Sequence, residues 1–244
     1  MSRRLETLLN GRQIYQDTER FMFGIDAVLL SDFAAKSIRK NHRVIDLGTG
    51  TGIIPLLLET STPASNFTAL EIQKDSADLA RQSVEKNALQ SKIKIVHGDL
   101  RDAPALFARH SFDVVVCNPP YTPAAHGKRN LSDSVSIARH EICCNLDDVI
   151  SAADFLLAPH GHFFMIHVPF RLPEILCRLE SHCLEAKVMR LVQPFADSGP
   201  NLVLIEARKN ARPGLKIMPN LIVRGADGGY TSEIRRIYGL EQGL

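Results

Sequence analysis

Residues 112–121 read Phe-Asp-Val-Val-Val-Cys-Asn-Pro-Pro-Tyr, an apolar β-branched run that ends in Asn-Pro-Pro-Tyr. Such an uninterrupted run predicts a strand buried on both faces, as in parallel sheets. Pro119 and Pro120 carry no backbone N–H, so they end the strand. Ligands in open α/β sheets bind beyond the carboxyl ends of the strands. We therefore expect Asn118 to face a site.

The polar end of this strand suits a planar amine such as the exocyclic nitrogen of adenine. The Asn118 side-chain oxygen and the Pro119 backbone carbonyl can accept hydrogen bonds from both N–H groups of the amine. These bonds favour a tetrahedral nitrogen and localise its lone pair. Tyr121 can stack on a flat target, a contact worth about 1–3 kcal/mol per base. The alternative is a proline turn after a strand, without chemistry.

A glycine-rich loop follows the predicted strand at 43–47. Gly48, Gly50 and Gly52 alternate with threonines, whereas a dinucleotide-binding fingerprint requires Gly-x-Gly-x-x-Gly. The alternating pattern, preceded by Asp46, resembles the loop that binds S-adenosylmethionine. The resemblance implies that Thr49 belongs to the cofactor-binding loop and that Asp46 helps to hold the ammonium group of the cofactor.

Two further strand ends carry acids. Glu71 closes the strand 67–71, and a carboxylate there can accept hydrogen bonds from both ribose hydroxyls of a nucleotide, with Ile72 beside it. In a fold of this kind Asp99 accepts from the amine of the cofactor's adenine, and the Leu100 amide faces the ring. Gly98-Asp99 is also an ordinary turn sequence.

The sequence before the predicted strand at 43–47 has patterns typical of helices. Leu5, Leu8 and Leu9 have the spacing of one face of a short helix, which suggests a docking arm. A second helix follows residue 24. Its Asp26 complements the positive end of the helix dipole. Asp26 also resembles part of the element that closes over the methionine end of the cofactor.

Basic residues follow Tyr121. Lys128 and Arg129 are candidates for phosphate contacts, with a solvated loop as the alternative. Arg139 and His140 are weaker candidates on the substrate side. His140 has no second histidine or cysteine at metal-ligand spacing, so we expect no metal.

Composition limits the possible classes. The chain has 244 residues, 45% of them hydrophobic and 23% charged, which is enough for one α/β domain. No 18-residue apolar segment or signal peptide is present, so we expect a cytoplasmic protein without a membrane contact. Five cysteines without Cys-x-x-Cys spacing argue for free thiols. The net charge of +2 permits nucleic-acid binding without requiring it.

Several motifs together resemble the bacterial tRNA(Val) adenine-N6 methyltransferase family. They are Phe23-Gly24-Ile25-Asp26, residues 46–58, Glu71-Ile72-Gln73, Asn118-Pro119-Pro120-Tyr121, Ala138-Arg139-His140-Glu141, Gly214-Leu215-Lys216-Ile217 and Tyr230-Thr231-Ser232-Glu233. The resemblance covers nearly the whole chain. It implies S-adenosylmethionine as cofactor and tRNA as partner. The target would be the adenine just 3′ of the anticodon, position 37. It says nothing of oligomeric state.

The expected fold is α/β and Rossmann-like, that of class I methyltransferases, with a seven-stranded, mostly parallel sheet and helices on both faces. We expect an N-terminal arm and cap helix over 1–42, a methyltransferase domain over 43–210 and a C-terminal extension over 211–244 packed on the core.

Other classes fit less well. A protein glutamine N5-methyltransferase uses the same four residues, but such enzymes usually carry a large helical domain before the first strand. A DNA adenine methyltransferase would normally add a base-reading domain. A cytosine-C5 enzyme needs a thiol in a Pro-Cys setting, and Cys117 precedes Asn118 instead. A non-catalytic RNA-binding module would not be expected to retain Glu71, Asn118 and the glycines.

Overall fold

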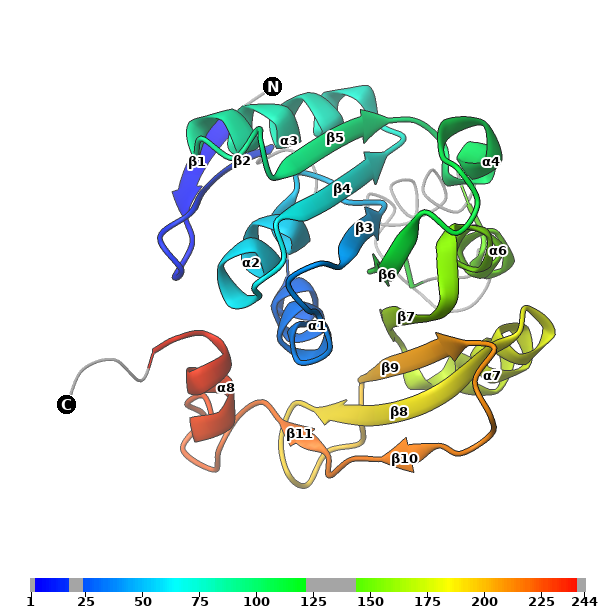
Figure 1. Ribbon diagram of the computed structural model, residues 1–244. Coiled ribbons are helices and arrows are strands. Elements are labelled where there is room, and N and C mark those ends of the chain that lie inside the picture. Colours follow the sequence, from blue (N-terminus) through cyan, green and yellow to red (C-terminus); the bar gives the residue numbers. More distant parts are fainter. Residues whose placement is uncertain (1–2, 18–23, 122–143, 241–244) are drawn as a thin grey trace, which may run out of the picture.

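A nine-stranded sheet runs through the molecule, and helices cover both of its faces (Figure 1). The structure is a computed structural model, and it describes residues 3–17, 24–121 and 144–240. A separate two-stranded sheet lies at the N-terminus.

The elements alternate between strand and helix through most of the chain. The strands are β1 (Arg3–Thr7), β2 (Gln13–Asp17), β3 (Arg43–Leu47), β4 (Asn66–Glu71), β5 (Ile93–His97), β6 (Phe112–Cys117), β7 (Leu157–His167), β8 (Leu184–Gln193), β9 (Leu202–Lys209), β10 (Lys216–Ile217) and β11 (Leu221–Ile222). The helices are α1 (Ile25–Ala35), α2 (Ile53–Ser61), α3 (Lys74–Lys86), α4 (Ala103–Leu106), α6 (Leu146–Leu156), α7 (Leu172–Ser181) and α8 (Ser232–Ile237), with short 3₁₀ turns η1 (Leu100–Asp102) and η2 (Pro169–Arg171).

The strand order of the large sheet is β10-β8-β9-β7-β6-β3-β4-β5, and β11 also pairs with β8. Strands β3 to β7 are parallel to one another, while β9 runs antiparallel between β7 and β8. This arrangement confirms the predicted fold class. The sheet exceeds the predicted seven strands because the C-terminal extension adds β10 and β11, each of two residues, along β8.

The core lies on both faces of the sheet. Helices α1, α2, α3 and α8 contribute to one apolar cluster, and α4, α6 and α7 contribute to the other. The central strand β6 is buried from Val114 to Cys117, as its β-branched sequence predicts. Within the described ranges, no helix combines the length and the apolar character that crossing a membrane requires.

The N-terminal residues form a β-hairpin, so the helix predicted from the leucine spacing is wrong. β1 and β2 pair antiparallel. Leu8 is 8% exposed but Leu9 is 62% exposed, so the leucines do not share a buried face. The turn between the strands contains Asn10-Gly11, and Gly11 has a φ of +82°. Asn-Gly is a strong hairpin signal because both residues tolerate positive φ, and here it outweighs the helical spacing.

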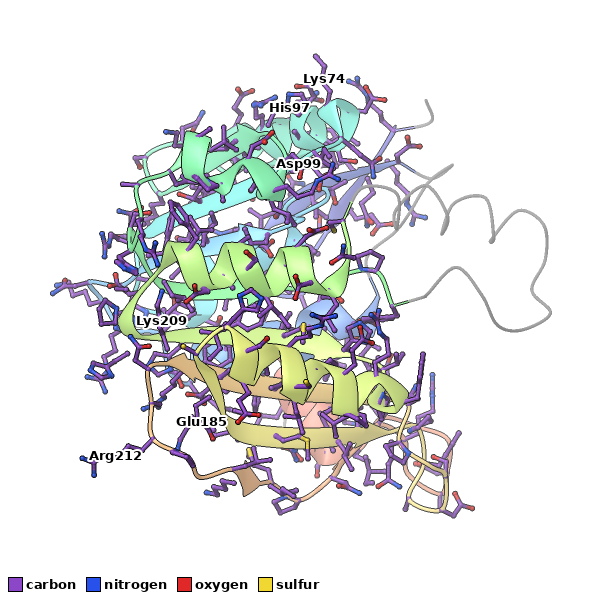
Figure 2. All side chains as sticks on the ribbon, turned by 90° about the vertical axis from the view of Figure 1, so that its right-hand side faces the viewer. Lys74, His97, Asp99, Glu185, Lys209 and Arg212 are labelled. Atoms are coloured by element: carbon purple, nitrogen blue, oxygen red, sulfur yellow. The ribbon has the colours of Figure 1, made fainter. Side chains whose placement is uncertain are left out.

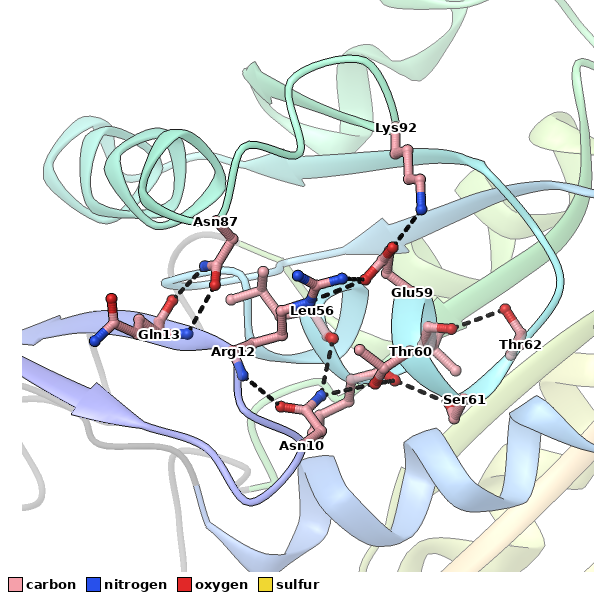
Figure 3. Close-up of polar contacts among 12 residues, drawn as sticks. Asn10, Arg12, Gln13, Leu56, Glu59, Thr60, Ser61, Thr62, Asn87 and Lys92 are labelled. Carbon is pink, nitrogen blue, oxygen red and sulfur yellow. Dashed lines mark hydrogen bonds and ion pairs between the residues drawn. The ribbon is translucent and has the colours of Figure 1, made fainter.

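Specific polar contacts dock the hairpin on α2 and α3 (Figure 3). The Gln13 backbone N–H donates to the Asn87 side chain at 2.9 Å, and the Asn87 amide donates back to the Gln13 carbonyl at 2.6 Å. Glu59 on α2, whose side chain is 3% exposed, accepts hydrogen bonds from Arg12 and from Lys92. The hairpin is therefore part of the folded unit.

We predict that Glu59→Gln lowers the free energy of unfolding by about 1–3 kcal/mol at pH 7, because it weakens hydrogen bonds from two charged groups. Burial alone would raise the pKa of Glu59, but hydrogen bonds from Lys92 and Arg12 outweigh it and lower that pKa below its ordinary value of 4.5. The stabilisation is thus present above about pH 4.5 and is lost as the pH falls below it. Urea unfolding at several pH values measures the difference. Glu85→Gln, at an exposed position on α3, is the matched control and should change little. An equal effect of both variants would contradict the assignment.

Candidate active site

The acidic and amide side chains expected at strand ends lie along one edge of the sheet. Parallel pairing aligns Leu47 with Leu70 and Cys117, and Glu71 with His97. The residues at this edge, in strand order, are Asp99 after β5, Glu71 on β4, Asp46 on β3, Asn118 after β6 and His167 on β7. The register therefore brings the predicted strand-end residues Asp46, Glu71, Asp99 and Asn118 to one edge, with His167 beside them.

The glycine loop between β3 and α2 depends on backbone conformations that glycine favours. Gly48, Gly50 and Gly52 have φ values of +73°, +58° and +90°. A Cβ added at Gly48 or Gly50 would meet nothing within 4 Å, whereas one at Gly52 would lie 3.3 Å from Ala80 on α3. The loop is thus packed at Gly52 and open at the other two glycines, where a ligand can approach the backbone.

Glu71 ties this loop to the end of β4. Its side chain is buried, and it accepts hydrogen bonds from the Gly50 N–H at 2.8 Å and the Gln73 N–H at 2.7 Å. A carboxylate has about four acceptor positions. Glu71 can therefore hold the loop and still accept from the hydroxyls of a ligand.

Asp46 is buried beside the loop without a partner. The residue is 2% exposed, and within the described chain neither carboxyl oxygen has a hydrogen-bond donor. Burial raises the pKa of Asp46 to about 7, the charge of Glu71 adds to the rise, and the nearby Thr49 hydroxyl opposes it. That hydroxyl is also buried, and its geometry falls short of a hydrogen bond. Burial of a polar group without a partner lowers the stability of the folded protein. The Asp46 carboxyl and the Thr49 hydroxyl are therefore suited to bind a ligand that carries hydrogen-bond donors.

Asp99 lies at the β5 edge next to His97, as Figure 2 shows. It caps η1, and its carboxylate accepts from the backbone N–H and the guanidinium of Arg101, at 2.9 Å in each case. These bonds lower the pKa of Asp99. Leu100 is buried, and the Ile72 carbonyl lies 3.0 Å from His97 Nε2. The cofactor contacts predicted for Asp99, Leu100 and Ile72 stay predictions.

Tyr121 is joined to two site residues. Its hydroxyl oxygen lies 2.6 Å from Asn118 Oδ1 and 2.8 Å from Asp26 Oδ2. Burial, and then the charge of Asp26, raise the pKa of Tyr121, so the phenol stays neutral. Its ring packs against His167, with 5.4 Å between centroids. Asn118 and Tyr121 remain partly exposed while Pro119 is buried. Stacking of Tyr121 on a target stays a prediction.

His167, which the sequence analysis does not single out, lies at the same edge of the sheet. It ends β7 next to Asn118, is 1% exposed, and accepts the Val168 N–H on Nδ1 at 2.7 Å. Burial, together with the charge of Arg171, lowers the pKa of His167 to about 4. The ring is therefore neutral at pH 7, with its proton on Nε2. The signal available was a polar residue closing an apolar strand, the same one that singled out Asn118.

Cys117 is buried, and its thiol donates to the Leu47 carbonyl at 3.2 Å. Burial raises its pKa well above the ordinary value, which disfavours a nucleophilic thiolate. Within the described ranges no three histidine, cysteine or acidic side chains gather as metal ligands. The predicted substrate contacts of Lys128, Arg129, Arg139 and His140 lie outside the described residues.

Comparison with known proteins identifies the family. Residues 24–169 match the model of the methyltransferase small domain. The chain belongs to this family. The match begins at the glycine before α1 and ends just after β7, so it spans every described strand end that carries a candidate site residue.

Curated relatives of this methyltransferase confirm the predicted resemblance. The protein of Aeromonas hydrophila named tRNA1(Val) (adenine(37)-N6)-methyltransferase is 26% identical over 223 residues, which are 90% of each chain. The protein of the same name from Porphyromonas gingivalis is 28% identical over 220 residues, 88% of this chain and 86% of its own.

Solved structures confirm the methyltransferase fold. A predicted O-methyltransferase from Agrobacterium tumefaciens superposes with a TM-score of 0.71 at 20% identity, covering 88% of this chain and 95% of its own. A geranyl diphosphate C-methyltransferase from Streptomyces coelicolor, in complex with S-adenosyl-L-homocysteine, has a TM-score of 0.56 at 12% identity, covering 75% and 74%.

We predict that Asp46→Asn stabilises the ligand-free methyltransferase increasingly as the pH rises. The folded carboxyl keeps its proton to about pH 7, while the unfolded one releases it near 3.8. The folded wild type thus binds more protons across this window and loses stability as the pH rises through it, by about 2–4 kcal/mol. Urea unfolding of both proteins at pH 5 and pH 8 measures the gap.

The matched control for this prediction is Asp197→Asn, which replaces an exposed carboxylate. Its stability relative to wild type should not change with pH in the same way. A gap between wild type and D46N that stays constant from pH 5 to pH 8 would contradict the buried, partnerless carboxyl.

Proposed function

We propose that this methyltransferase transfers the methyl group of S-adenosylmethionine to the exocyclic N6 of an adenine in tRNA, the adenine at position 37 of tRNA(Val), in the cytoplasm. The observation that carries the proposal is the position of Asn118 and Tyr121 at the carboxyl end of the central strand β6, beside the glycine loop. The names of the curated relatives give the nucleic acid and the position.

The residues present fit the cofactor. Asp46 has two buried oxygens for which the described part of the chain supplies no donor, and these match an ammonium group. Glu71 keeps acceptor positions for ribose hydroxyls. The open sides of Gly48 and Gly50 leave the backbone accessible. When bound, S-adenosylmethionine supplies an electrophilic methyl group on a positively charged sulfur. Asp99, Leu100 and Ile72 are the proposed contacts of its adenine.

Asn118 and Pro119 prepare the nucleophile. The N6 lone pair of adenine is delocalised into the ring, and acceptors for both N–H groups localise it on nitrogen. The Asn118 oxygen and the Pro119 carbonyl are these acceptors, and proline holds the second in place. Tyr121 stacks on the base, which must leave its own stack to reach the site. Holding the amine in line with the methyl group supplies much of the rate enhancement.

The second candidate is methylation of a protein glutamine, because a side-chain amide is also a planar nitrogen with two N–H groups. The polar groups of Asn118 and Pro119 do not distinguish these substrates. The curated relatives favour adenine, and they also disfavour a module without catalysis.

The deciding experiment incubates the protein with methyl-labelled S-adenosylmethionine and total small RNA from a strain that lacks this gene. N6-methyladenosine confined to tRNA(Val) is the expected product in nucleoside analysis. Label in a protein glutamine, or no transfer at all, would reject the proposal.

We predict that Asn118→Ala lowers the single-turnover rate by about 100-fold or more, the usual effect of removing one such polar contact in a transition state. The affinity for S-adenosylmethionine, measured by calorimetry, should stay nearly unchanged. The control is Asn41→Ala, at an exposed residue before the amino end of β3, which should leave both quantities as they are. Equal rates for N118A and wild type would refute the role of the amide.

We predict that reversing the charges of Lys128 and Arg129 weakens tRNA binding. If both contact phosphates, the plot of the logarithm of the binding constant against that of the salt concentration becomes shallower by about 2. Filter binding at four salt concentrations measures the slope. Reversal of the exposed pair Lys40 and Arg39 after α1 is the control. An unchanged slope in the first variant would place Lys128 and Arg129 off the phosphate path.

A further inference from the structure

The hydroxyl of Tyr121 faces two acceptors but has one proton. Its oxygen lies 2.8 Å from Asp26 Oδ2 and 2.6 Å from Asn118 Oδ1. A phenol can donate to only one of these oxygens in a full hydrogen bond. The choice matters, because the oxygen of Asn118 is the group proposed to accept the target amine.

The carboxylate is the stronger acceptor of the two, since hydrogen bonds to a charged group are roughly twice as strong as neutral ones. When Tyr121 donates to Asp26, the amide oxygen of Asn118 faces a hydroxyl oxygen at 2.6 Å with no proton between them. A half-turn of the amide relieves this repulsion, because Nδ2 then donates to the hydroxyl oxygen. All three groups are satisfied in that arrangement, and the Asn118 oxygen is available to an incoming donor.

We propose that Asp26 is a positioning residue for methyl transfer: by accepting the hydroxyl proton of Tyr121, it orients the Asn118 amide with its oxygen free for the target amine. The inference rests on the proposed function. It assigns Asp26 to the target side of the site through Tyr121, and not to the cofactor contact expected from the sequence.

The start of α1 leaves room for this arrangement. Asp26 is the second residue of the helix, and Gly24 is its N-cap. A Cβ at Gly24 would lie 2.8 Å from Asp26 Oδ1, closer than real Cβ contacts. Glycine at this position therefore allows the carboxylate to adopt its observed place, with Oδ2 on Tyr121.

The C-terminal extension supports the helix that carries Asp26. α8 packs against α1 through the buried Ile234. Arg190 on β8 donates two hydrogen bonds of 2.8 Å to Glu233 and so fastens α8 to the sheet. Burial, then Tyr230, then the charge of Asp26 raise the pKa of Tyr238 to about 12, so this phenol is neutral at pH 7.

A simpler role for Asp26 is to complement the helix dipole, which would contribute only to stability. The two roles differ in one respect. Stabilisation of the helix does not depend on the hydroxyl of Tyr121, whereas orientation of Asn118 does.

The test is a double-mutant cycle with Asp26→Asn, Tyr121→Phe and the double variant, read by single-turnover transfer to tRNA. Y121F removes the hydroxyl and keeps the ring. We expect D26N to lower the rate about 10-fold when Tyr121 is intact, and less than about 2-fold in the Y121F background, because the loss of a charge-assisted bond counts only once. The affinities for S-adenosylmethionine and tRNA should be unchanged. Asp26→Ala should reproduce the pattern, and Gly24→Ala should lower the rate in the same direction.

Asp32→Asn is the matched control, because Asp32 lies on the same helix and pairs only with Lys36 in the described chain. It should leave the rate as it is. Additive losses in the cycle, or a loss of cofactor affinity in D26N, would overturn the inference. The same cycle in thermal unfolding needs no RNA and separates the two proposals. If the two substitutions are coupled in thermal unfolding but the protein does not methylate tRNA, the proposed function is rejected and the Asp26–Tyr121 bond is retained. If the protein methylates tRNA but the losses of rate are additive, the function is retained and the positioning role of Asp26 is rejected.

Discussion

Parallel pairing of β3 with β4 and β6 is the constraint on which the site depends. In this register Asp46 lies opposite Ala69 and Val116, and the strand ends coincide. A slip of one residue would exchange the two faces of β3 and carry Asp46 to the opposite side. The apolar layers on both faces of the sheet oppose such a slip, because it would move the Asp46 carboxyl into the apolar cluster that contains Ile45 and Leu47. The same packing that stabilises the sheet therefore holds a carboxyl group in a place without donors.

The cofactor side of the site contains hydrogen-bond acceptors, the carboxyl groups of Asp46 and Glu71, whose capacity the described residues do not fill. Glu71 accepts a hydrogen bond from the Gly50 N–H in the glycine loop and another from the Gln73 N–H, and the first of these fixes the loop relative to β4. Among the residues that the structure describes, Asp46 has no such partner, and the charge of Glu71 disfavours its ionisation further. A ligand with an ammonium and two hydroxyl groups would supply what both acids lack. The cost of burying the Asp46 carboxylate and the affinity for such a ligand thus have one physical source.

The target side of the site combines segments that are distant in the chain. Asp26 comes from the first helix, Tyr121 from the end of the central strand and His167 from the next strand. Packing of α8 on α1 makes the extension part of this arrangement. The N-terminal hairpin docks separately, on α2 and α3, through polar contacts with Asn87 and Glu59.

Local patterns in the amino-acid sequence were enough to predict several features of the site. The β-branched run ending in Asn118 specified a buried strand with a polar end, the spaced glycines specified a loop with positive φ, and Glu71 closed a second strand. The hydrogen-bond partners of these groups follow from the three-dimensional packing alone. The bond between Tyr121 and Asp26 joins residues 95 positions apart, and no period or composition reports it. The helix predicted for the N-terminal residues is wrong, because helical spacing over a few residues is a weaker signal than the turn sequence Asn10-Gly11. Secondary-structure propensity and hydrophobic periodicity are properties of one segment, so they can be recognised in the sequence. Hydrogen bonds between distant segments form only when packing of the helices on the sheet brings those segments together.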